Sequence, residues 1–196
     1  MELGLLYSGG KDSTLAALLL EDFYDVTLVT AQFGISEDWK HARSSAETIG
    51  FPFERLDLDP DVAHDAVDRI RADGFPRNGI QLVHQHALER AARDGFDVIA
   101  DGTRRDDRVP TVSRAQAQSL EDRHDVEYVA PLSGFGRTAV DRLVEAHLEV
   151  VAGPSEEIER ADYEAELREI IAAEDGPDAV AELFPDHDQT YVTGRR

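Results

Sequence analysis

The hydrophobic positions of the chain change period repeatedly, from short apolar runs to segments in which apolar residues recur at helical spacing. This alternation predicts parallel βαβ units, that is, an α/β fold in which helices cover both faces of one sheet. The apolar runs predict strands at residues 3–6, 26–33, 53–58, 98–100 and 127–130. The helical periodicity predicts helices around residues 15–19 and at residues 39–49, 61–73, 79–94, 113–123 and 138–149.

The last part of the chain has a different pattern. Residues 162–173 form one clear amphipathic helix pattern, and residues 188–196 predict an irregular tail. Gly153-Pro154-Ser155 is the best candidate for a boundary, because glycine and proline interrupt regular structure. We therefore predict a core domain at residues 1–152 and a helical C-terminal appendix at residues 153–196 that packs on it.

A glycine turn joins the first predicted strand to the first predicted helix. Such a turn directs unpaired backbone N–H groups and the positive end of a helix dipole at one spot, which suits a phosphate group. It is not a Walker A loop, because Leu5 stands where that motif needs glycine, and adjacent glycines do not make a dinucleotide-binding fingerprint. The alternative is a tight turn that binds no ligand. The turn has the sequence Ser8-Gly9-Gly10-Lys11-Asp12-Ser13-Thr14.

The net charge of the chain indicates the kind of cytosol and the kind of partner that suit this protein. The sequence has 41 acidic and 20 basic residues, a net charge of −21, and its only lysines are Lys11 and Lys40. This composition suits a cytosol of very high salt, typical of a halophile, where self-repulsion is screened. The alternative is an acidic surface that binds a basic partner. Acidity argues against a broad nucleic-acid footprint, although Arg104, Arg105 and Arg108 cluster locally.

The cysteine count and the hydropathy of the chain exclude cysteine-based sites and a membrane-spanning segment. The chain contains no cysteine, which excludes disulfides, thiolate metal sites, iron–sulfur clusters and a persulfide carried by the chain itself. Its longest apolar run, residues 15–20, is far too short to span a membrane, and no signal peptide is visible. We therefore expect a soluble, cytoplasmic protein with no membrane partner.

The glycine turn resembles the PP-loop, Ser-Gly-Gly-x-Asp-Ser, of the N-type ATP pyrophosphatases. The resemblance implies the Rossmann-like adenine nucleotide alpha-hydrolase fold, with five parallel strands in the order 3-2-1-4-5, and cleavage of ATP between its α- and β-phosphates. Three groups of nucleotide-binding residues follow from it. Ser8, Gly9, Gly10, Lys11, Asp12, Ser13 and Thr14 would hold phosphates, Ala31 and Phe33 would hold adenine, and Asp101, Gly102 and Thr103 would lie near the α-phosphate.

Charged residues at the predicted strand ends are candidates for catalysis, because open parallel sheets bind ligands there. Lys11 would neutralise phosphate charge, and Arg104 would stabilise charge on the departing pyrophosphate. Asp12 and Asp107 are candidate magnesium ligands, since Mg²⁺ prefers carboxylate and phosphate oxygens. Alternatively, Asp12 is a first-turn acid stabilised by the helix dipole, and the loop at residues 101–110 is solvated and held by ion pairs.

Arg137 and His84 are two further candidate site residues. Arg137 stands where the superfamily's Pro-Leu…Lys-x-Glu-Val segment has lysine. The positive charge is retained, so we expect Arg137 to contact phosphate and count it as a fifth candidate catalytic residue, whereas Ala139 replaces the usual glutamate. His84 shares a helix face with Asn78 and Gln81, and that face would look into the site. A lone helical histidine is more often structural, which is the alternative for His84.

The resemblance extends over nearly the whole chain to a family of stand-alone archaeal PP-loop ATPases. That family is labelled a predicted subunit of an enzyme that forms 2-thiouridine in tRNA. The segments that carry the resemblance beyond the loop are Trp39-Lys40-His41-Ala42, residues 100–110, Gln118-Ser119-Leu120-Glu121-Asp122-Arg123, residues 131–137 and residues 162–168.

The resemblance implies an enzyme that uses ATP and Mg²⁺ to adenylate an acceptor, with release of pyrophosphate, and it implies tRNA as a partner. Because the chain lacks cysteine, sulfur must come from a partner protein or from free sulfide. The alternatives are a nucleotide-binding sensor or regulatory subunit without catalysis, an ammonia-dependent amide ligase that takes ammonia from a partner, and a scaffold with a degenerate site. A homodimer is compatible with each.

Overall fold

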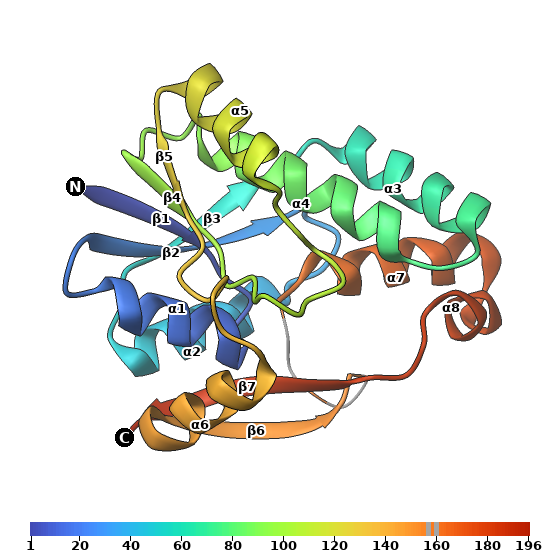
Figure 1. Ribbon diagram of the computed structural model, residues 1–196. Helices are drawn as coiled ribbons and strands as arrows, with labels where there is room; N and C mark the ends of the chain where they lie inside the picture. Colours follow the sequence, from blue (N-terminus) through green and yellow to red (C-terminus); the bar gives the residue numbers. More distant parts are fainter. Residues whose placement is uncertain (156–157, 159–160) are drawn as a thin grey trace.

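The computed structural model describes residues 1–155, 158 and 161–196. A parallel sheet of five strands lies at its centre in the order β3-β2-β1-β4-β5, which confirms the predicted fold class and strand order (Figure 1). Leu5 of β1 is in register with Leu28 of β2 on one side and with Ala100 of β4 on the other. The strands are β1 (Glu2–Leu6), β2 (Asp25–Gln32), β3 (Phe53–Asp57), β4 (Val98–Ala100) and β5 (Glu127–Val129).

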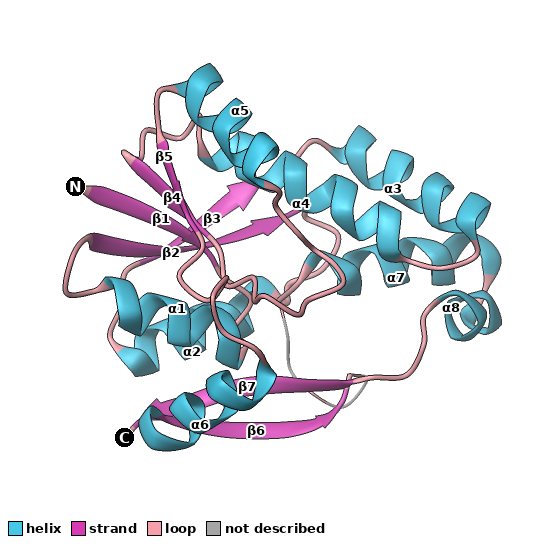
Figure 2. Cartoon of the chain, viewed as in Figure 1, coloured by secondary structure: helices cyan, strands magenta, loops and turns pink. Residues whose placement is uncertain are grey.

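Helices cover both faces of the sheet because successive side chains of a strand point to opposite sides. Figure 2 shows helices on both sides of the sheet. Leu3 and Leu5 contribute to one hydrophobic core and Leu6 to the other, and all three are buried. The first core includes residues of α1 (Lys11–Leu20), α2 (Trp39–Ile49) and α6 (Arg137–His147). The second includes residues of α3 (Pro60–Asp73), α4 (Arg77–Ala91), α5 (Arg114–His124), α7 (Tyr163–Asp175) and α8 (Pro177–Leu183).

Several helix ends follow signals that the sequence carries. Gly50 and Gly74 end α2 and α3 with φ values of 82° and 72°, the left-handed conformation in which glycine commonly ends a helix. Asp59 begins α3, because its carboxylate accepts the backbone N–H of Asp61 at 3.0 Å. Helices α2 and α3 therefore begin and end close to their predicted positions.

The C-terminal region departs from the prediction, since residues 188–196 do not form an irregular tail. They contain a strand, β7 (Asp188–Arg195), which pairs in antiparallel fashion with β6 (Leu148–Pro154). Helix α6 accordingly stops at His147 and does not continue to residue 149. The physical reason is burial: Leu148 and Val192 are almost fully buried in the first core, so the two-stranded sheet of β6 and β7 is stabilised by packing that local patterns do not reveal.

The division of the chain at residue 152 stays a prediction, and β6 itself runs through that position. Residues 156, 157, 159 and 160, which belong to the predicted appendix, lie outside the described residues. Among the helices of the described residues, none is both long and apolar enough to cross a membrane.

Candidate functional site

The glycine turn after β1 forms an open helix N-terminus. Gly9 has a φ of +85°, which is costly for residues with a Cβ, and Gly10 is the N-cap of α1 without any side-chain cap. Strand β1 lies between β2 and β4, where the strand order reverses, and this is where open parallel sheets bind ligands. Among the described residues, the backbone N–H groups of Gly9, Gly10 and Asp12 have no acceptor. The turn therefore presents donors to an anion, as predicted for a phosphate loop.

The hydroxyl groups of the loop serve its own backbone. Ser13 Oγ and Thr14 Oγ1 hydrogen-bond to the carbonyl oxygen of Gly10 at 3.2 and 2.9 Å. Thr14 is fully buried and also contacts the hydroxyl of Tyr7 at 3.1 Å. In this arrangement Ser13 and Thr14 fix the shape of the loop, and their predicted contact with phosphate remains a prediction.

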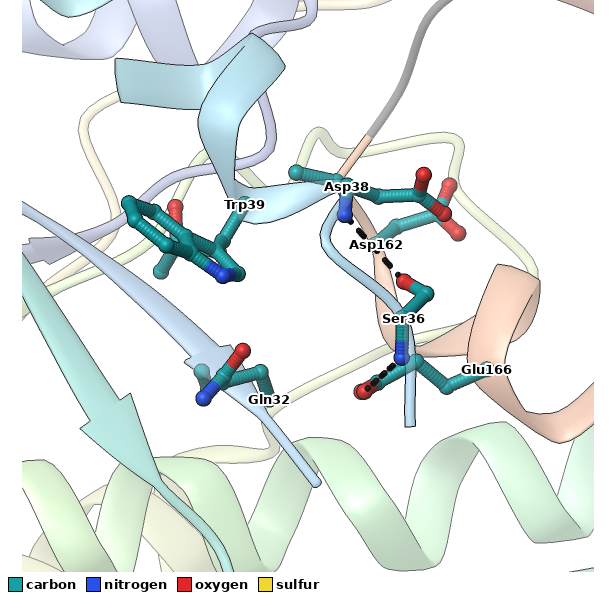
Figure 3. A pocket seen from close by; sticks show the side chains of 9 residues that line it. Gln32, Ser36, Asp38, Trp39, Asp162 and Glu166 are labelled. Atoms are coloured by element: carbon teal, nitrogen blue, oxygen red, sulfur yellow. Dashed lines mark hydrogen bonds between the residues drawn. The ribbon is translucent and has the colours of Figure 1, made fainter. Parts of the chain in front are cut away.

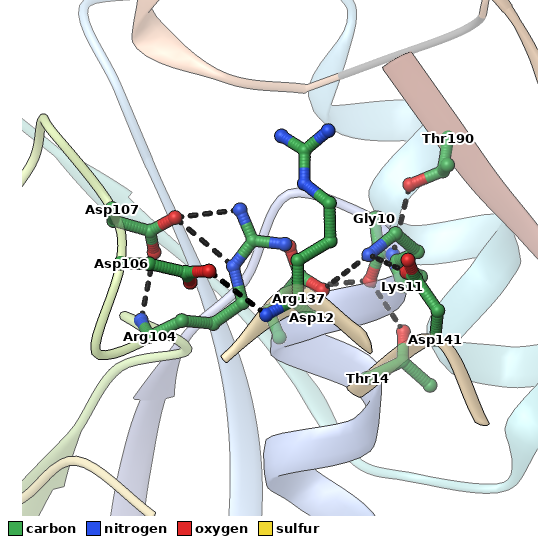
Figure 4. A network of polar contacts seen from close by, with 11 residues as sticks. Gly10, Lys11, Asp12, Thr14, Arg104, Asp106, Asp107, Arg137, Asp141 and Thr190 are labelled. Atoms are coloured by element: carbon green, nitrogen blue, oxygen red, sulfur yellow. Dashed lines mark hydrogen bonds and ion pairs between the residues drawn. The ribbon is translucent and has the colours of Figure 1, made fainter. Parts of the chain in front are cut away.

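Charged side chains around the loop form one continuous network (Figure 4). Lys11 Nζ lies 2.8 Å from Asp12 Oδ1 and 3.0 Å from Asp141 Oδ1 of α6. Asp12 Oδ2 lies 3.4 Å from Arg104, whose guanidinium also binds Asp107 Oδ1 at 2.6 Å. The structure thus brings together four of the five predicted catalytic residues, Lys11, Asp12, Arg104 and Asp107, at the ends of β1 and β4.

Electrostatics keep Arg104 charged in this network. Burial by itself lowers the pKa of Arg104, but the hydrogen bond with Asp107 and the charge of Asp12 outweigh it, so the pKa is raised above its ordinary value. Only 13% of the Arg104 side chain is exposed. A guanidinium held in this way is a fixed positive charge beside the phosphate loop.

The turn that follows β5 contacts the loop that follows β4. Arg105 donates its backbone N–H to Phe135 O at 3.1 Å, and Arg137 donates its own to Asp106 Oδ2 at 3.0 Å. The guanidinium of Arg137 is exposed and has no partner among the described residues (Figure 4). The fifth predicted catalytic residue is therefore placed at the rim, free to contact an anion.

Gly102 lies directly against the start of α1. A Cβ at this position would approach the backbone of Ser13 to 2.8 Å, closer than real Cβ contacts. The absence of a side chain at Gly102 thus allows the end of β4 to meet the phosphate loop. Its neighbour Thr103 hydrogen-bonds through Oγ1 to Asp101 at 2.6 Å.

Asp101 is buried behind the site. Its carboxylate accepts hydrogen bonds from His84 Nε2 and the Tyr128 hydroxyl, both at 2.9 Å, and from the backbone N–H of Thr103, and it is only 2% exposed. Burial raises the pKa of Asp101, but the hydrogen bond and charge of His84, together with Thr103, lower it on balance. Asp101 is thus an anion that positions Thr103, and His84, whose Nδ1 contacts Tyr163 at 2.6 Å, has the structural role that was the alternative.

A small pocket lies at the end of β2, where adenine binding was predicted (Figure 3). Ala31 lines it, whereas Phe33 packs against the second core. The backbone N–H of Phe33 is bound by Glu166 Oε2 at 2.7 Å, and is therefore not free to bind a base. The side chains labelled around the pocket are those of Gln32, Ser36, Asp38, Trp39, Asp162 and Glu166.

Sequence reasoning missed three residues of this region. Glu166 lies in a segment that the family resemblance singled out, so that signal was available. Asp141 lies one helical turn after Arg137, and nothing in the sequence linked it to Lys11. Thr190, whose Oγ1 accepts the backbone N–H of Lys11 at 3.2 Å, lies in the segment predicted as irregular.

The two predicted magnesium ligands differ in their fit. Asp12 belongs to the glycine turn itself, and Mg²⁺ is usually held by one or two carboxylates together with phosphate oxygens. Its two oxygens lie 2.8 Å from Lys11 and 3.4 Å from Arg104, so Asp12 suits this role when the phosphates of a nucleotide take over these two cations. Both oxygens of Asp107 are instead bound by Arg104, through its backbone N–H and its guanidinium. In the described part of the chain, no three His, Asp or Glu side chains gather as a ready-made metal site. The residues present therefore fit a magnesium ion that arrives with a nucleotide.

The model of a protein family of unknown function, DUF7411, matches residues 1–194 of the chain. An uncharacterized protein of Methanocaldococcus jannaschii is 38% identical over 195 residues, which cover 99% of this chain and 96% of that protein. A crystal structure from the same organism, described as a predicted subunit of a tRNA methyltransferase, superposes with a TM-score of 0.90 at 37% identity. It covers 100% of this chain and 98% of that chain.

More distant similarities reach proteins with named activities. Argininosuccinate synthase of Natronomonas pharaonis is 27% identical over 145 residues, 68% of this chain and 35% of that enzyme. A tRNA-specific 2-thiouridylase of Syntrophus aciditrophicus is 33% identical over 118 residues, 50% of this chain and 32% of that enzyme. The U34-tRNA thiolase of Methanococcus maripaludis shares the fold, with a TM-score of 0.52 at 16% identity over 92% of this chain and 69% of that chain.

Proposed function

We propose a function from one premise: the chain belongs to the DUF7411 family and to the PP-loop ATPases. We infer that it binds ATP, transfers the adenylyl group to an acceptor and releases pyrophosphate. The observation that carries this proposal is the N-terminus of α1, where the backbone N–H groups of Gly9, Gly10 and Asp12 have no acceptor among the described residues, at the point where the strand order reverses. This position supplies backbone donors and a helix dipole to a polyphosphate.

Each charged residue of the network has a role in this proposal. Lys11 and the backbone donors of the loop bind the outer phosphates, while Arg104 and Arg137 stabilise the negative charge that develops as pyrophosphate leaves. Asp12 holds Mg²⁺, which would neutralise phosphate charge when bound. Because transfer at phosphorus needs positioning and charge neutralisation more than covalent help, these residues suffice for the first step.

The proposed acceptor is a tRNA base. Support comes from the relatives, since the 2-thiouridylase and the U34-tRNA thiolase act on tRNA by name, and the similar Methanocaldococcus structure is described as a predicted subunit of a tRNA methyltransferase. The chain carries no cysteine, so a sulfur atom delivered to an adenylated base must come from a partner protein or from free sulfide. Adenylation of the base is the step that we assign to this chain.

Incubation with ATP labelled at the α-phosphate, Mg²⁺ and the tRNA fraction of an archaeal extract tests the proposal. We expect labelled AMP or labelled RNA, together with unlabelled pyrophosphate. Lys11→Met should abolish this product, and Lys40→Met is the matched control, because Lys40 is an exposed residue of α2 that pairs with Glu37. Formation of ADP and phosphate alone, or equal activity of the two variants, would contradict the proposal.

Lys11 pairs with two carboxylates, those of Asp12 and Asp141, which offset its positive charge. Because a lysine neutralised in this way stabilises developing negative charge less well, the pairing favours a second candidate function, a nucleotide sensor without turnover. Such a protein would hold a nucleotide in the same loop and leave it intact. Recovery of uncleaved ATP after prolonged incubation with every tRNA fraction, at saturating occupancy, would select the sensor. Release of AMP would exclude it.

A further inference from the structure

Strand β7 lies directly on the phosphate loop. The backbone N–H of Val192 donates to Gly9 O at 3.0 Å, and Thr190 Oγ1 accepts the backbone N–H of Lys11 at 3.2 Å. Between them, the ring of Tyr191 covers Gly9, because a Cβ on Gly9 would lie 3.4 Å from it. Three consecutive residues of β7 thus contact Gly9 and Lys11, on either side of the N-cap Gly10.

This contact is fixed from behind. The hydroxyl of Tyr191 donates to His41 O at 3.0 Å, and Ser45 Oγ of α2 binds Val192 O at 2.9 Å. Val192 is fully buried, and the other edge of β7 pairs with β6. The strand therefore presents Thr190 at a defined position, and the Thr190 side chain can rotate without displacement of the strand.

The N–H of Lys11 is the first of helix α1, and an anion at the helix N-terminus would accept it. A single N–H forms one good hydrogen bond, so a phosphate oxygen and Thr190 Oγ1 compete for it. An anionic oxygen is the stronger acceptor, since charge-assisted hydrogen bonds are roughly twice as strong as neutral ones. A hydroxyl is a neutral acceptor that satisfies this donor only while no anion is present.

We propose that Thr190 is a placeholder for a phosphate oxygen: its hydroxyl binds Lys11 N–H in the ligand-free protein, and the polyphosphate displaces it. Asp141 has the equivalent role at Lys11 Nζ, 3.0 Å away. The inference rests on the proposed phosphate loop but requires no catalysis. In this proposal the C-terminal strand β7 is a part of the binding site. Its Thr190 lowers the affinity of the site for polyphosphate, and the Thr190 side chain moves when the site is occupied.

Calorimetric titration with inorganic triphosphate, and then with Mg-ATP, tests the placeholder. Thr190→Val keeps the shape of the side chain and removes the acceptor, so we expect it to bind both ligands about three- to tenfold more tightly than the wild type. Thr190→Ser should bind like the wild type. Thr193→Val is the matched control, because Thr193 lies on the same strand, is exposed and contacts Glu149 O instead.

Two further measurements keep the inference testable if Thr190→Val is poorly folded. Asp141→Asn, at an exposed position, should also bind inorganic triphosphate more tightly. In the ligand-free Thr190→Ser variant, the Lys11 amide should exchange its hydrogen as slowly as in the wild type. In the ligand-free Thr190→Val variant, the same amide should exchange faster than in the wild type. Unchanged or weaker triphosphate binding by Thr190→Val or Asp141→Asn, or no binding by any protein, overturns the inference. Tighter binding without AMP formation supports the placeholder and contradicts only the proposed adenylation.

Discussion

Glu166 of α7 accepts the backbone N–H of Phe33 at 2.7 Å, which joins the C-terminal region to the end of β2 across 133 residues of sequence. The same carboxylate binds the backbone N–H of Ile35 at 2.9 Å and approaches that of Ser36 at 3.4 Å. Glu166 is only 3% exposed. The loop that borders the pocket at the end of β2 therefore takes its shape from a buried negative charge on α7.

Replacement of Glu166 by alanine should be costly, because it leaves three backbone N–H groups of one loop without their acceptor. We expect a loss of about 2–4 kcal/mol in the free energy of unfolding, together with weaker ATP binding. Urea unfolding and titration with ATP measure the two effects. Glu169→Ala, at an exposed position of the same helix, is the control and should change neither by a comparable amount.

The buried carboxylate of Asp101 should make the free energy of unfolding fall at acidic pH. Its pKa in the folded protein lies below its ordinary value of 3.8, so its stabilising contribution is complete above that pH and is lost as the pH falls through the lowered pKa. Asp101→Asn should reduce stability near neutral pH by about 2–3 kcal/mol, and the difference from the wild type should shrink below pH 3.8.

Unfolding free energies measured between about pH 3 and 7 check this expectation. The exposed substitution Asp22→Asn serves as the control, with a difference from the wild type that stays small throughout. A deficit of Asp101→Asn that is constant over the whole range would contradict the assignment of Asp101 as a buried anion.

Gly102→Ala should separate the end of β4 from the phosphate loop. The new Cβ would meet the backbone of Ser13 at 2.8 Å, and backbone cannot rotate away as a flexible side chain can. We expect a loss of about 1–3 kcal/mol in stability and weaker binding of ATP. Gly134→Ala provides the comparison, since nothing lies within 4 Å of a Cβ at that position. Equal thermal stability of the two variants would show that the contact at Gly102 is unimportant.

Arg137 should matter for turnover and not for folding, because its guanidinium is exposed and has no partner among the described residues. We expect Arg137→Ala to lower the rate of AMP formation by about 100- to 1,000-fold, the loss typical when one donor to developing charge is removed. Its melting temperature should match that of the wild type. Arg142→Ala, on the same helix, controls for loss of surface charge, and an equal fall in rate for both variants would refute a specific role.

The sequence predicted those features that depend on neighbouring residues. The turn at Gly9 and Gly10, the helix ends at Gly50 and Gly74 and the parallel strands all follow from local signals and periodicity. The pairing of β6 with β7 did not, since a two-stranded sheet is marginal by itself and forms here because Leu148 and Val192 join the first core. The fold class was thus predictable, and this two-stranded sheet was not.

The site could be predicted as a location but not as a set of contacts. Lys11, Asp12, Arg104 and Asp107 do meet, because the ends of neighbouring parallel strands share one edge of the sheet. Their pairing with one another, and the burial of Asp101 behind Thr103, depend on side-chain positions that no spacing rule encodes. Glu166 and Thr190 reach the site from distant parts of the chain, which local patterns cannot show.

The contact between Thr190 and Lys11 also has a consequence for the order of events during synthesis. A ribosome must add 179 residues after Lys11 before Thr190 exists to meet it. Contacts between such distant positions form late and slow the final stage of folding. The sheet around β1 is complete only after β4 and β5 have been made. From that point until Thr190 is added, the Lys11 amide of a folded nascent chain is uncovered, and a cellular polyanion can occupy the loop before the C-terminal strand does.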